Sequence, residues 1–391
     1  MNNIRNNSIR NLFFNILQKM IGKKDIFCLD FTFNDYSALY HLSKFHDLAH
    51  LVADALDKNG SLENSEICNK FRNERNLAIY RYEQINYAFE EISEIFEKEK
   101  IFNIPLKGAI LRSYYPQEWM RTSCDIDILV KADEIKKIVR LLTKKYAYQC
   151  VIHTQHDYSL YSPTGVHIEL HFILIFHDKT GDEFTKKVWA NSMPAEGYSY
   201  RLKMPNELFF AYHIAHMAQH ILEGGGCGVK PFLDLKVIRK AMQIDVWEAQ
   251  HVLDDLGLTT FAEKATQLSE FWFGEQERNE PLKEFEEFIL CGGVYGTLEN
   301  KIEIGATRKK GKVGYVCRRL FLPYRSLCLL YPSLKKCPIL FPFYQIRRWF
   351  RVLKKDGVNI SQAIKEVQSV SILENSEVQK ISKMLETLGL K

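Results

Sequence analysis

The chain has 391 residues, of which 46% are apolar and 26% are charged, and its formal net charge is +5. This composition is that of a soluble globular protein and excludes collagen-like, low-complexity and coiled-coil chains. No segment reaches the roughly 18 uninterrupted apolar residues of a membrane span, so we expect no transmembrane segment. At about 150 residues per domain, the length predicts two or three domains.

The cysteine pattern indicates the compartment. Nine cysteines are present without any C-x-x-C pair. An odd number with no zinc-type spacing favours free thiols in a reducing compartment. The apolar stretches near the N-terminus are too short, and too often interrupted by polar residues, for a secretory signal. We therefore expect a cytoplasmic protein.

Residues 1–100 predict an N-terminal helical region. Between Tyr82 and Phe96, apolar residues recur at steps of three and four, which places them on one face of a helix. Because such a stripe needs a partner, we expect this helix to pack against the next segment.

Residues 101–195 are predicted to form an α/β domain. Strand-like runs lie at residues 101–106, 125–130, 148–153, 158–161 and 166–175. A short helix-like stretch follows the first run and ends before Pro116, and Asp133 is the expected N-cap of a helix after the second run. The predicted fold class is therefore α/β (α+β), with a small mixed sheet embedded between helical segments.

Residues 196–300 predict a helical domain, and residues 301–391 a basic, aromatic-rich C-terminal helical region. In the former, Lys230 and Asp234 open a helix-like segment, and they are interpreted either as residues that face the nucleotide or as a commonplace surface pair. The glycine loop 224–228, which lacks the P-loop pattern, is interpreted as a flexible hinge.

From Arg308 to Lys355 there are 14 Lys and Arg residues and no Asp or Glu. Because the whole chain carries +5, subtracting these 14 charges leaves −9 on the remainder. A small helical domain with a basic rim needs no partner, whereas RNA or an anionic membrane surface are alternative contacts.

The run Asp125-Ile126-Asp127-Ile128-Leu129-Val130 carries two acids. Alternate side chains of a strand share a face, so Asp125 and Asp127 point the same way with Cα atoms about 6–7 Å apart. Like charges this close raise one another's pKa unless a cation neutralises them, and their oxygen ligands suit Mg²⁺. By itself, the pattern more often marks two solvated acids at a strand edge.

The later run Val166-His167-Ile168-Glu169-Leu170-His171-Phe172 alternates in the same way. If this strand lies beside the first, Glu169 is the third carboxylate around one or two Mg²⁺ ions, an arrangement that serves nucleotidyl transfer. His167 and His171 then tune the charge of Glu169, orient an acceptor or fill the sheet face.

A phosphate-binding turn is predicted upstream of the acids. Lys107 and Gly108 lie where a strand turns into a helix, and glycine lets the backbone approach a phosphate there. Arg121 and Ser123 offer a charge and a hydroxyl to a triphosphate. We expect these residues to bind the nucleotide.

The Lys-Gly … Arg-x-Ser-x-Asp-x-Asp pattern resembles the bacterial nucleotidyltransferase-like family of the polymerase-beta superfamily, and is also similar to abortive-infection toxin nucleotidyltransferases. Four segments carry the resemblance: Ile104-Pro105-Leu106-Lys107-Gly108-Ala109, Tyr115-Pro116, Arg121-Thr122-Ser123-Cys124-Asp125-Ile126-Asp127 and Ile168-Glu169-Leu170-His171. The resemblance implies that residues 101–195 form a nucleotidyltransferase-like α/β domain. It also implies phosphate binding by Gly108 and its neighbours, Lys107 and Ala109 included, metal binding by Asp125 and Asp127, and a third acid from Glu169. Ala109 departs from the serine or second glycine usual in the superfamily, which removes a hydroxyl or some backbone freedom near the phosphates.

An acceptor groove is predicted from His171, His213, His216 and Lys230. His213 and His216 share a helix face with His220. Transition-metal binding by these three is the alternative, but no fourth ligand is indicated.

The sequence therefore predicts a Mg²⁺- or Mn²⁺-dependent enzyme in which Asp125, Asp127 and Glu169 are the catalytic, metal-binding residues. An acceptor hydroxyl attacks the α-phosphate of an NTP and pyrophosphate leaves; Glu169 is alternatively the general base. Replacing Asp127 by Asn is expected to abolish transfer and leave the fold intact. Two alternatives are a non-catalytic nucleotide-binding or scaffold protein on the same fold, and a toxin that acts on RNA. The acceptor, whether small molecule, protein or RNA, is left open.

Overall fold

The computed structural model describes residues 2–22, 33–62, 65–154, 156–175, 179–274, 282–308, 314, 317, 320–354 and 375–391. The chain forms two compact units, one of residues 1–217 and 228–286 and the other of residues 218–227 and 287–391. Within the described ranges, no helix has the length and apolar character needed to cross a membrane. The four-segment division predicted from the sequence stays a prediction.

The first unit begins with four helices, α1 (Asn2–Gly22), α2 (Phe33–Phe45), α3 (Ala49–Lys58) and α4 (Glu66–Lys98). The Ser65 side chain caps α4 by accepting a hydrogen bond from the Cys68 backbone N–H at 3.3 Å. The predicted apolar stripe of α4 is buried from Ile85 to Phe96, while Tyr82 at its start is half-buried. This buried face packs on the sheet that follows.

The sheet of the first unit is mixed, which confirms the α+β class. Its strands are β1 (Asn103–Pro105), β2 (Asp125–Val130), β3 (Gln149–His153), β4 (Asp157–Tyr161) and β5 (His167–His171). They lie in the order β1-β2-β5-β4-β3, and β2 and β5 pair in parallel while the other neighbours are antiparallel. The two strands with the predicted acids are therefore adjacent at the centre of the sheet.

One face of this sheet is apolar. Ile126, Ile128 and Val130 of β2 belong to a buried cluster shared with α4 and with α6 (Ile135–Lys145). Such burial contributes about 1.5–3 kcal/mol per large aliphatic side chain. Because side chains alternate along β2, the two aspartates point to the opposite face.

The predicted N-cap of α6 is wrong. The cap position is Glu134 rather than Asp133, and its side chain makes no capping hydrogen bond. Instead, the backbone N–H groups of Glu134 and Ile135 donate to the Lys131 carbonyl at 3.1 and 3.0 Å. The preceding turn thus satisfies the donors that a capping side chain would otherwise bond.

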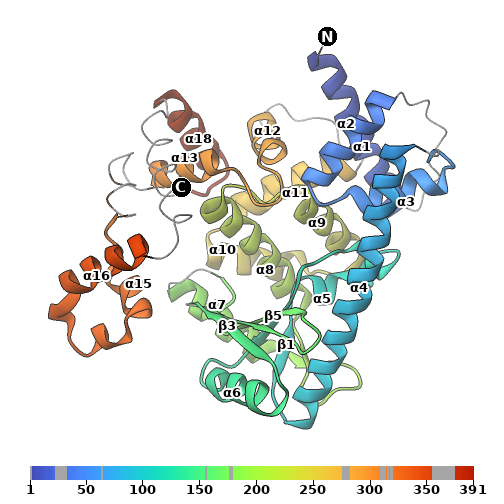
Figure 1. Cartoon of the computed structure of the whole chain (residues 1–391). Coiled ribbons are helices and arrows are strands. Elements are labelled where there is room, and N and C mark those ends of the chain that lie inside the picture. The colour runs from blue at the N-terminus through green and yellow to red at the C-terminus, as the bar shows by residue number, and fades with distance from the viewer. Residues whose placement is uncertain are drawn as a thin grey trace. The chain divides into compact units, whose positions relative to one another are not determined.

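The rest of the first unit is helical around a small hairpin. Its elements are α5 (Gly108–Leu111), η1 (Arg112–Tyr114), η2 (Glu118–Met120), α7 (Lys179–Asn191), β6 (Met193–Pro194), β7 (Leu202–Lys203), α8 (Asn206–Gln219), α9 (Lys230–Ala241), α10 (Val246–Leu256), α11 (Thr259–Phe273) and α12 (Lys283–Gly292), of which α8 and α12 also enter the second unit. Figure 1 shows α8 and α6 on opposite sides of the sheet.

The second unit contains η3 (His220–Gly224), α13 (Leu298–Arg308), α15 (Tyr324–Leu330), η5 (Pro332–Lys335), η6 (Pro338–Leu340), α16 (Phe341–Lys354) and α18 (Asn375–Thr387). Its glycine loop packs against backbone: a Cβ on Gly226 would lie 2.9 Å from Gly296 Cα. Gly225, at φ +87°, is equally crowded by residues 297 and 301. The glycines therefore permit close packing, which the hinge interpretation did not anticipate.

The basic segment is described in part; residues 309–313, 315–316, 318–319 and 355 lie outside the described residues. Its α16 exposes Phe343, Ile346 and Phe350, and the exposed Arg347 and Arg351 follow at helical spacing. The other face packs in part, since Tyr344 belongs to a small apolar cluster with α15.

Candidate active site

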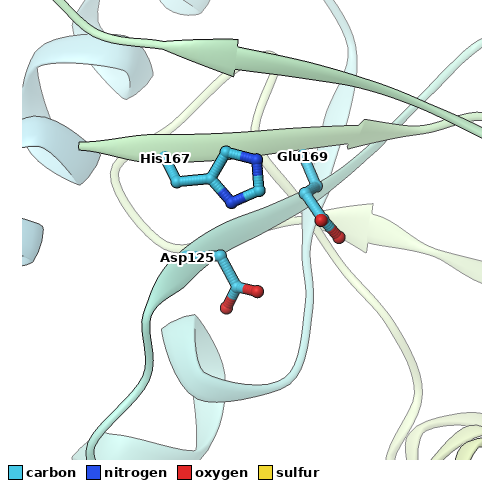
Figure 2. Close-up of side chains that lie close together, drawn as sticks. All are labelled: Asp125, His167 and Glu169. Atoms are coloured by element: carbon cyan, nitrogen blue, oxygen red, sulfur yellow. The ribbon is translucent and has the colours of Figure 1, made fainter. Parts of the chain in front are cut away.

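Two neighbouring strands bring the predicted acids together on the polar face of the sheet. In the β2–β5 register, Asp127 pairs with Glu169 and Asp125 with His167, while His171 lies opposite Leu129. Figure 2 shows Asp125 on β2 and His167 and Glu169 on β5, with their side chains gathered in one place. The condition on which the sequence hypothesis depended, that the two strands lie side by side, is met.

Asp127 is held by two nitrogen donors. Its Oδ1 accepts hydrogen bonds from Lys107 Nζ at 2.8 Å and from His171 Nε2 at 2.7 Å. The residue is only 4% exposed, and the same His171 nitrogen lies 3.4 Å from Glu169 Oε2. A buried carboxylate of this kind is stable only because it is paired.

The two aspartates differ in electrostatic environment. Burial, with the nearby Asp127 and Glu169 carboxylates, raises the pKa of Asp125 to about 6. Burial alone would raise the pKa of Asp127 too, but Lys107 and His171 hold it well below its usual range. Burial likewise opposes the charged form of His171, yet its hydrogen bonds to Asp127 and Glu169 raise its pKa to about 9. Negative charge is therefore least compensated at Asp125.

The predicted phosphate turn is tightly built. Lys107 has φ +42°, a region that costs a non-glycine residue energy, and its side chain reaches Asp127. A Cβ on Gly108 would lie 3.3 Å from Ser123 Cβ and Oγ, so glycine here lets the segment before β2 come close. Ala109 packs against the apolar cluster of the sheet. Ser123 Oγ accepts a hydrogen bond from Arg112 at 3.0 Å.

Arg121 lies in a buried ion pair. Its Nε donates to both carboxylate oxygens of Asp234 on α9, at 2.7 and 2.9 Å. The Tyr115 hydroxyl donates to Asp234 Oδ1 at 2.7 Å. Asp234 is fully buried, so it is no member of a surface pair, and that interpretation is wrong.

Lys230, one turn before Asp234 on α9, binds Thr122, the residue that follows Arg121 in the chain. Its Nζ donates to Thr122 Oγ1 at 2.9 Å and forms an ion pair with Asp47, from the α2–α3 connection. One turn of α9 therefore holds Arg121 and Thr122, two consecutive residues of the chain that leads into β2.

The remaining predicted groove residues lie on α8. His213 Nε2 donates to the Pro231 carbonyl at 2.8 Å, and burial lowers the pKa of its ring. His216 is half-buried, with its ring centroid 6.0 Å from that of Tyr212. Tyr212 is itself buried, and its pKa is raised by burial and by the acids of β2 and β5. These contacts explain the two histidines as packing residues as readily as groove residues.

Sequence reasoning missed Asp47, Thr122 and Tyr212, and it missed the role of Asp234. Asp47 and Asp234 are separated from their partners by 75 to 183 residues, so no local spacing relates them. Tyr115 belongs to the motif, but the motif indicates no partner for it. A signal was available only for Asp234, as an acid one helical turn after Lys230.

Comparison with known proteins adds one finding. Residues 33–274 match a family described as uncharacterised nucleotidyltransferase. The match covers α2 to α11 and includes every site residue described above. No curated protein matches the chain.

Proposed function

Because this chain belongs to the uncharacterised nucleotidyltransferase family, we propose that it transfers a nucleoside monophosphate from an NTP to an acceptor hydroxyl. The carrying observation is that Asp125 and Asp127 of β2 lie beside Glu169 of β5, with Lys107 of the adjacent turn bonded to Asp127. Acids from two adjacent strands next to a lysine are the groups that such a transfer requires.

In the proposed reaction, an acceptor oxygen bonds to the α-phosphorus and the bond from that phosphorus to the bridging oxygen breaks, releasing pyrophosphate. Lys107 keeps 21% of its side chain exposed and offers a positive charge to the phosphates beside Gly108, Ala109 and Ser123. The acceptor's proton passes to solvent or to Glu169, whose Oε2 lies 3.4 Å from His171 Nε2.

A divalent ion fits the chemistry of these donors. Asp125 and Glu169 are partly exposed carboxylates whose negative charge is incompletely compensated, which is what a hard cation binds. When bound, the ion neutralises charge that develops on the phosphates. We assign Asp125, Asp127 and Glu169 to it, with Mg²⁺ or Mn²⁺ as the ion.

Arg121 and Lys230 have a structural part in this proposal. Both side chains bond to protein groups, and together with α9 they fix the segment that carries Ser123 and leads to Asp125. We therefore propose that they position the site, and that the acceptor groove is formed by His171, His213 and His216 without a direct role for Lys230.

Labelled NTPs test the function. The protein is incubated with each of the four α-³²P-NTPs, Mg²⁺ or Mn²⁺ and a cell extract, and labelled molecules and pyrophosphate are measured. Wild type should label an acceptor, whereas Asp125→Asn and Glu169→Gln should not. Asp182→Asn, an acid on α7 outside the cluster, is the control and should label as wild type does. Equal labelling by all four proteins would refute the proposal.

One observation favours the alternative of a non-catalytic nucleotide-binding or scaffold protein. Lys107 and His171 already engage Oδ1 of Asp127, which leaves fewer lone pairs for an ion. Nucleotide binding by calorimetry without any pyrophosphate release would establish this alternative. The toxin alternative differs only in its acceptor, and labelling of RNA in the same extract would establish it.

We also propose that the basic C-terminal region contacts an anionic surface. The support is the exposed face of α16, where Phe343, Ile346 and Phe350 lie among arginines. Such helices lie in the interface of anionic membranes.

A further inference from the structure

Two groups of metal-ligating side chains lie on the polar face of the sheet and share Glu169. The inner group is Asp127, Glu169 and His171, and the outer group is Asp125, His167 and Glu169. In each group the ligand atoms lie within 4.8 Å of one another. The two groups differ in how many of their ligand lone pairs already accept hydrogen bonds within the protein.

The inner group is occupied by hydrogen bonds. Asp127 Oδ1 accepts from Lys107 and His171, and the His171 Nε2 that faces both acids is the donor in this contact. A ring nitrogen that carries a proton has no lone pair for a metal. The inner group therefore resembles a closed, self-neutralised ion-pair cluster.

The outer group is open. Asp125, His167 and Glu169 are each only half-buried, and in the described part of the chain no basic side chain forms an ion pair with Asp125. Asp125 and His167 are direct partners in the parallel register, and Glu169 follows His167 on the same face of β5. Figure 2 shows that these three side chains converge from two strands.

We propose that the divalent ion of this site binds in the outer group, with the imidazole of His167 as a nitrogen ligand beside the Asp125 and Glu169 carboxylates. This inference rests on the proposed function and specifies its metal. Asp127 lies beside this group, where Lys107 and His171 bond to its Oδ1.

The nitrogen ligand decides which ion is preferred. Mg²⁺ takes oxygen ligands in a near-ideal octahedron, whereas imidazole binds transition metals, and affinity for mixed nitrogen and oxygen sites rises along the first-row series from Mn²⁺. Two carboxylates and one imidazole therefore favour Mn²⁺ over Mg²⁺. The sequence hypothesis, which placed the ion among carboxylates alone, gave no such preference.

Mn²⁺ alone is the probe, and the readout is spectroscopic. Binding to the full-length protein is followed by loss of the free Mn²⁺ EPR signal, and nitrogen ligation by the ¹⁴N modulation of the bound ion. Mg²⁺ affinity is obtained by competition. Wild type should show ¹⁴N modulation, and His167→Asn should lose it and bind Mn²⁺ about tenfold or more weakly, with little change for Mg²⁺.

Two controls accompany this variant. His251→Asn replaces an exposed histidine of α10 and should behave as wild type does. His167→Gln is a second replacement in case His167→Asn does not fold, as judged by its thermal unfolding in chelator.

Unchanged ¹⁴N modulation and Mn²⁺ preference in folded His167 variants would overturn the inference, as would a wild-type Mn²⁺ complex without nitrogen modulation. Failure of the function is separate. If wild type shows the modulation but labels no acceptor, the metal site stands and the transferase proposal fails. If wild type labels an acceptor and the His167 variants keep the modulation, the transferase proposal stands and the metal-site proposal fails.

Discussion

His50 on α3 gives the protein a calculable dependence on pH. Its Nε2 donates to the Met120 carbonyl at 2.9 Å and so ties α3 to the segment before β2. The ring is 3% exposed and packs at 6.3 Å from the Trp119 ring. Burial, aided by the nearby Lys230 charge, lowers the pKa of His50 to about 4, although Asp47 and Glu74 oppose this. The folded protein therefore holds this imidazole neutral.

The magnitude follows from linkage. In the unfolded chain the ring titrates near 6.5 and in the folded protein near 4, a gap equivalent to about 3 kcal/mol. Because the unfolded state takes up the proton first, this stability is complete above pH 6.5 and is lost as the pH falls toward 4. At pH 4.5 the loss should be roughly 2–3 kcal/mol.

The assay compares wild type with His50→Gln, whose amide can still donate to the Met120 carbonyl but does not titrate. Urea unfolding is measured at pH 7.5, 6.5, 5.5 and 4.5, and the difference in unfolding free energy between the two proteins is plotted. Other groups cancel in this difference, which should move by roughly 2–3 kcal/mol in favour of the variant. A difference that stays constant over the series would refute the reasoning.

Three further predictions concern the site, the second unit and its surface. Asp127→Asn leaves Lys107 and His171 without their shared anion, so we expect a loss of about 3–5 kcal/mol of unfolding free energy in chelator, whereas Asp125→Asn should cost little. Gly226→Ala should lower the unfolding free energy of the full-length chain because the new Cβ meets backbone at 2.9 Å, unlike Gly224→Ala, which has an ordinary contact at 3.7 Å. Phe350→Ser should weaken sedimentation with anionic vesicles about tenfold, since it removes a large apolar side chain from the α16 surface.

Each of these predictions has a contradicting result. For the aspartates it is equal destabilisation by both substitutions, and for the glycines equal melting temperatures of the two alanine variants. For α16 it is equal binding of wild type and variant, or binding to neutral vesicles as strong as to anionic ones. The expected destabilisation by Asp127→Asn bears on function too, because the sequence hypothesis expected this substitution to leave the fold intact. Asp125 and Glu169 are therefore the better positions for testing activity.

Period-two alternation was sufficient to predict the central strands and the face on which Asp125, Asp127 and Glu169 lie. A strand offers few local alternatives once one of its faces is apolar, so this pattern determines which side chains face together. The order of elements also predicted the mixed sheet, though not that β2 and β5 would be neighbours, which was stated as a condition.

The sequence pattern could not predict which side chains pair in the folded protein. The lysine of the turn was expected to face phosphate, and no rule of spacing relates it to an aspartate 20 residues later. Arg121 was assigned to the nucleotide for its charge, but a buried acid of α9 engages it. The helix cap at Asp133 failed for a local reason, because a backbone turn satisfied the donors first. Charge and residue type predict that a group needs a partner, and only the fold selects which one.

The two cations bonded to Asp127 have a consequence for how the protein is made. Because its countercharges come from the polypeptide, the Asp127 carboxylate can be buried as soon as β2 and β5 meet, without a metal ion. Zinc-finger domains, in contrast, stay unfolded until their metal ion binds. A newly synthesised chain should thus reach its native state during metal starvation, and remain a ready receptor when the supply returns.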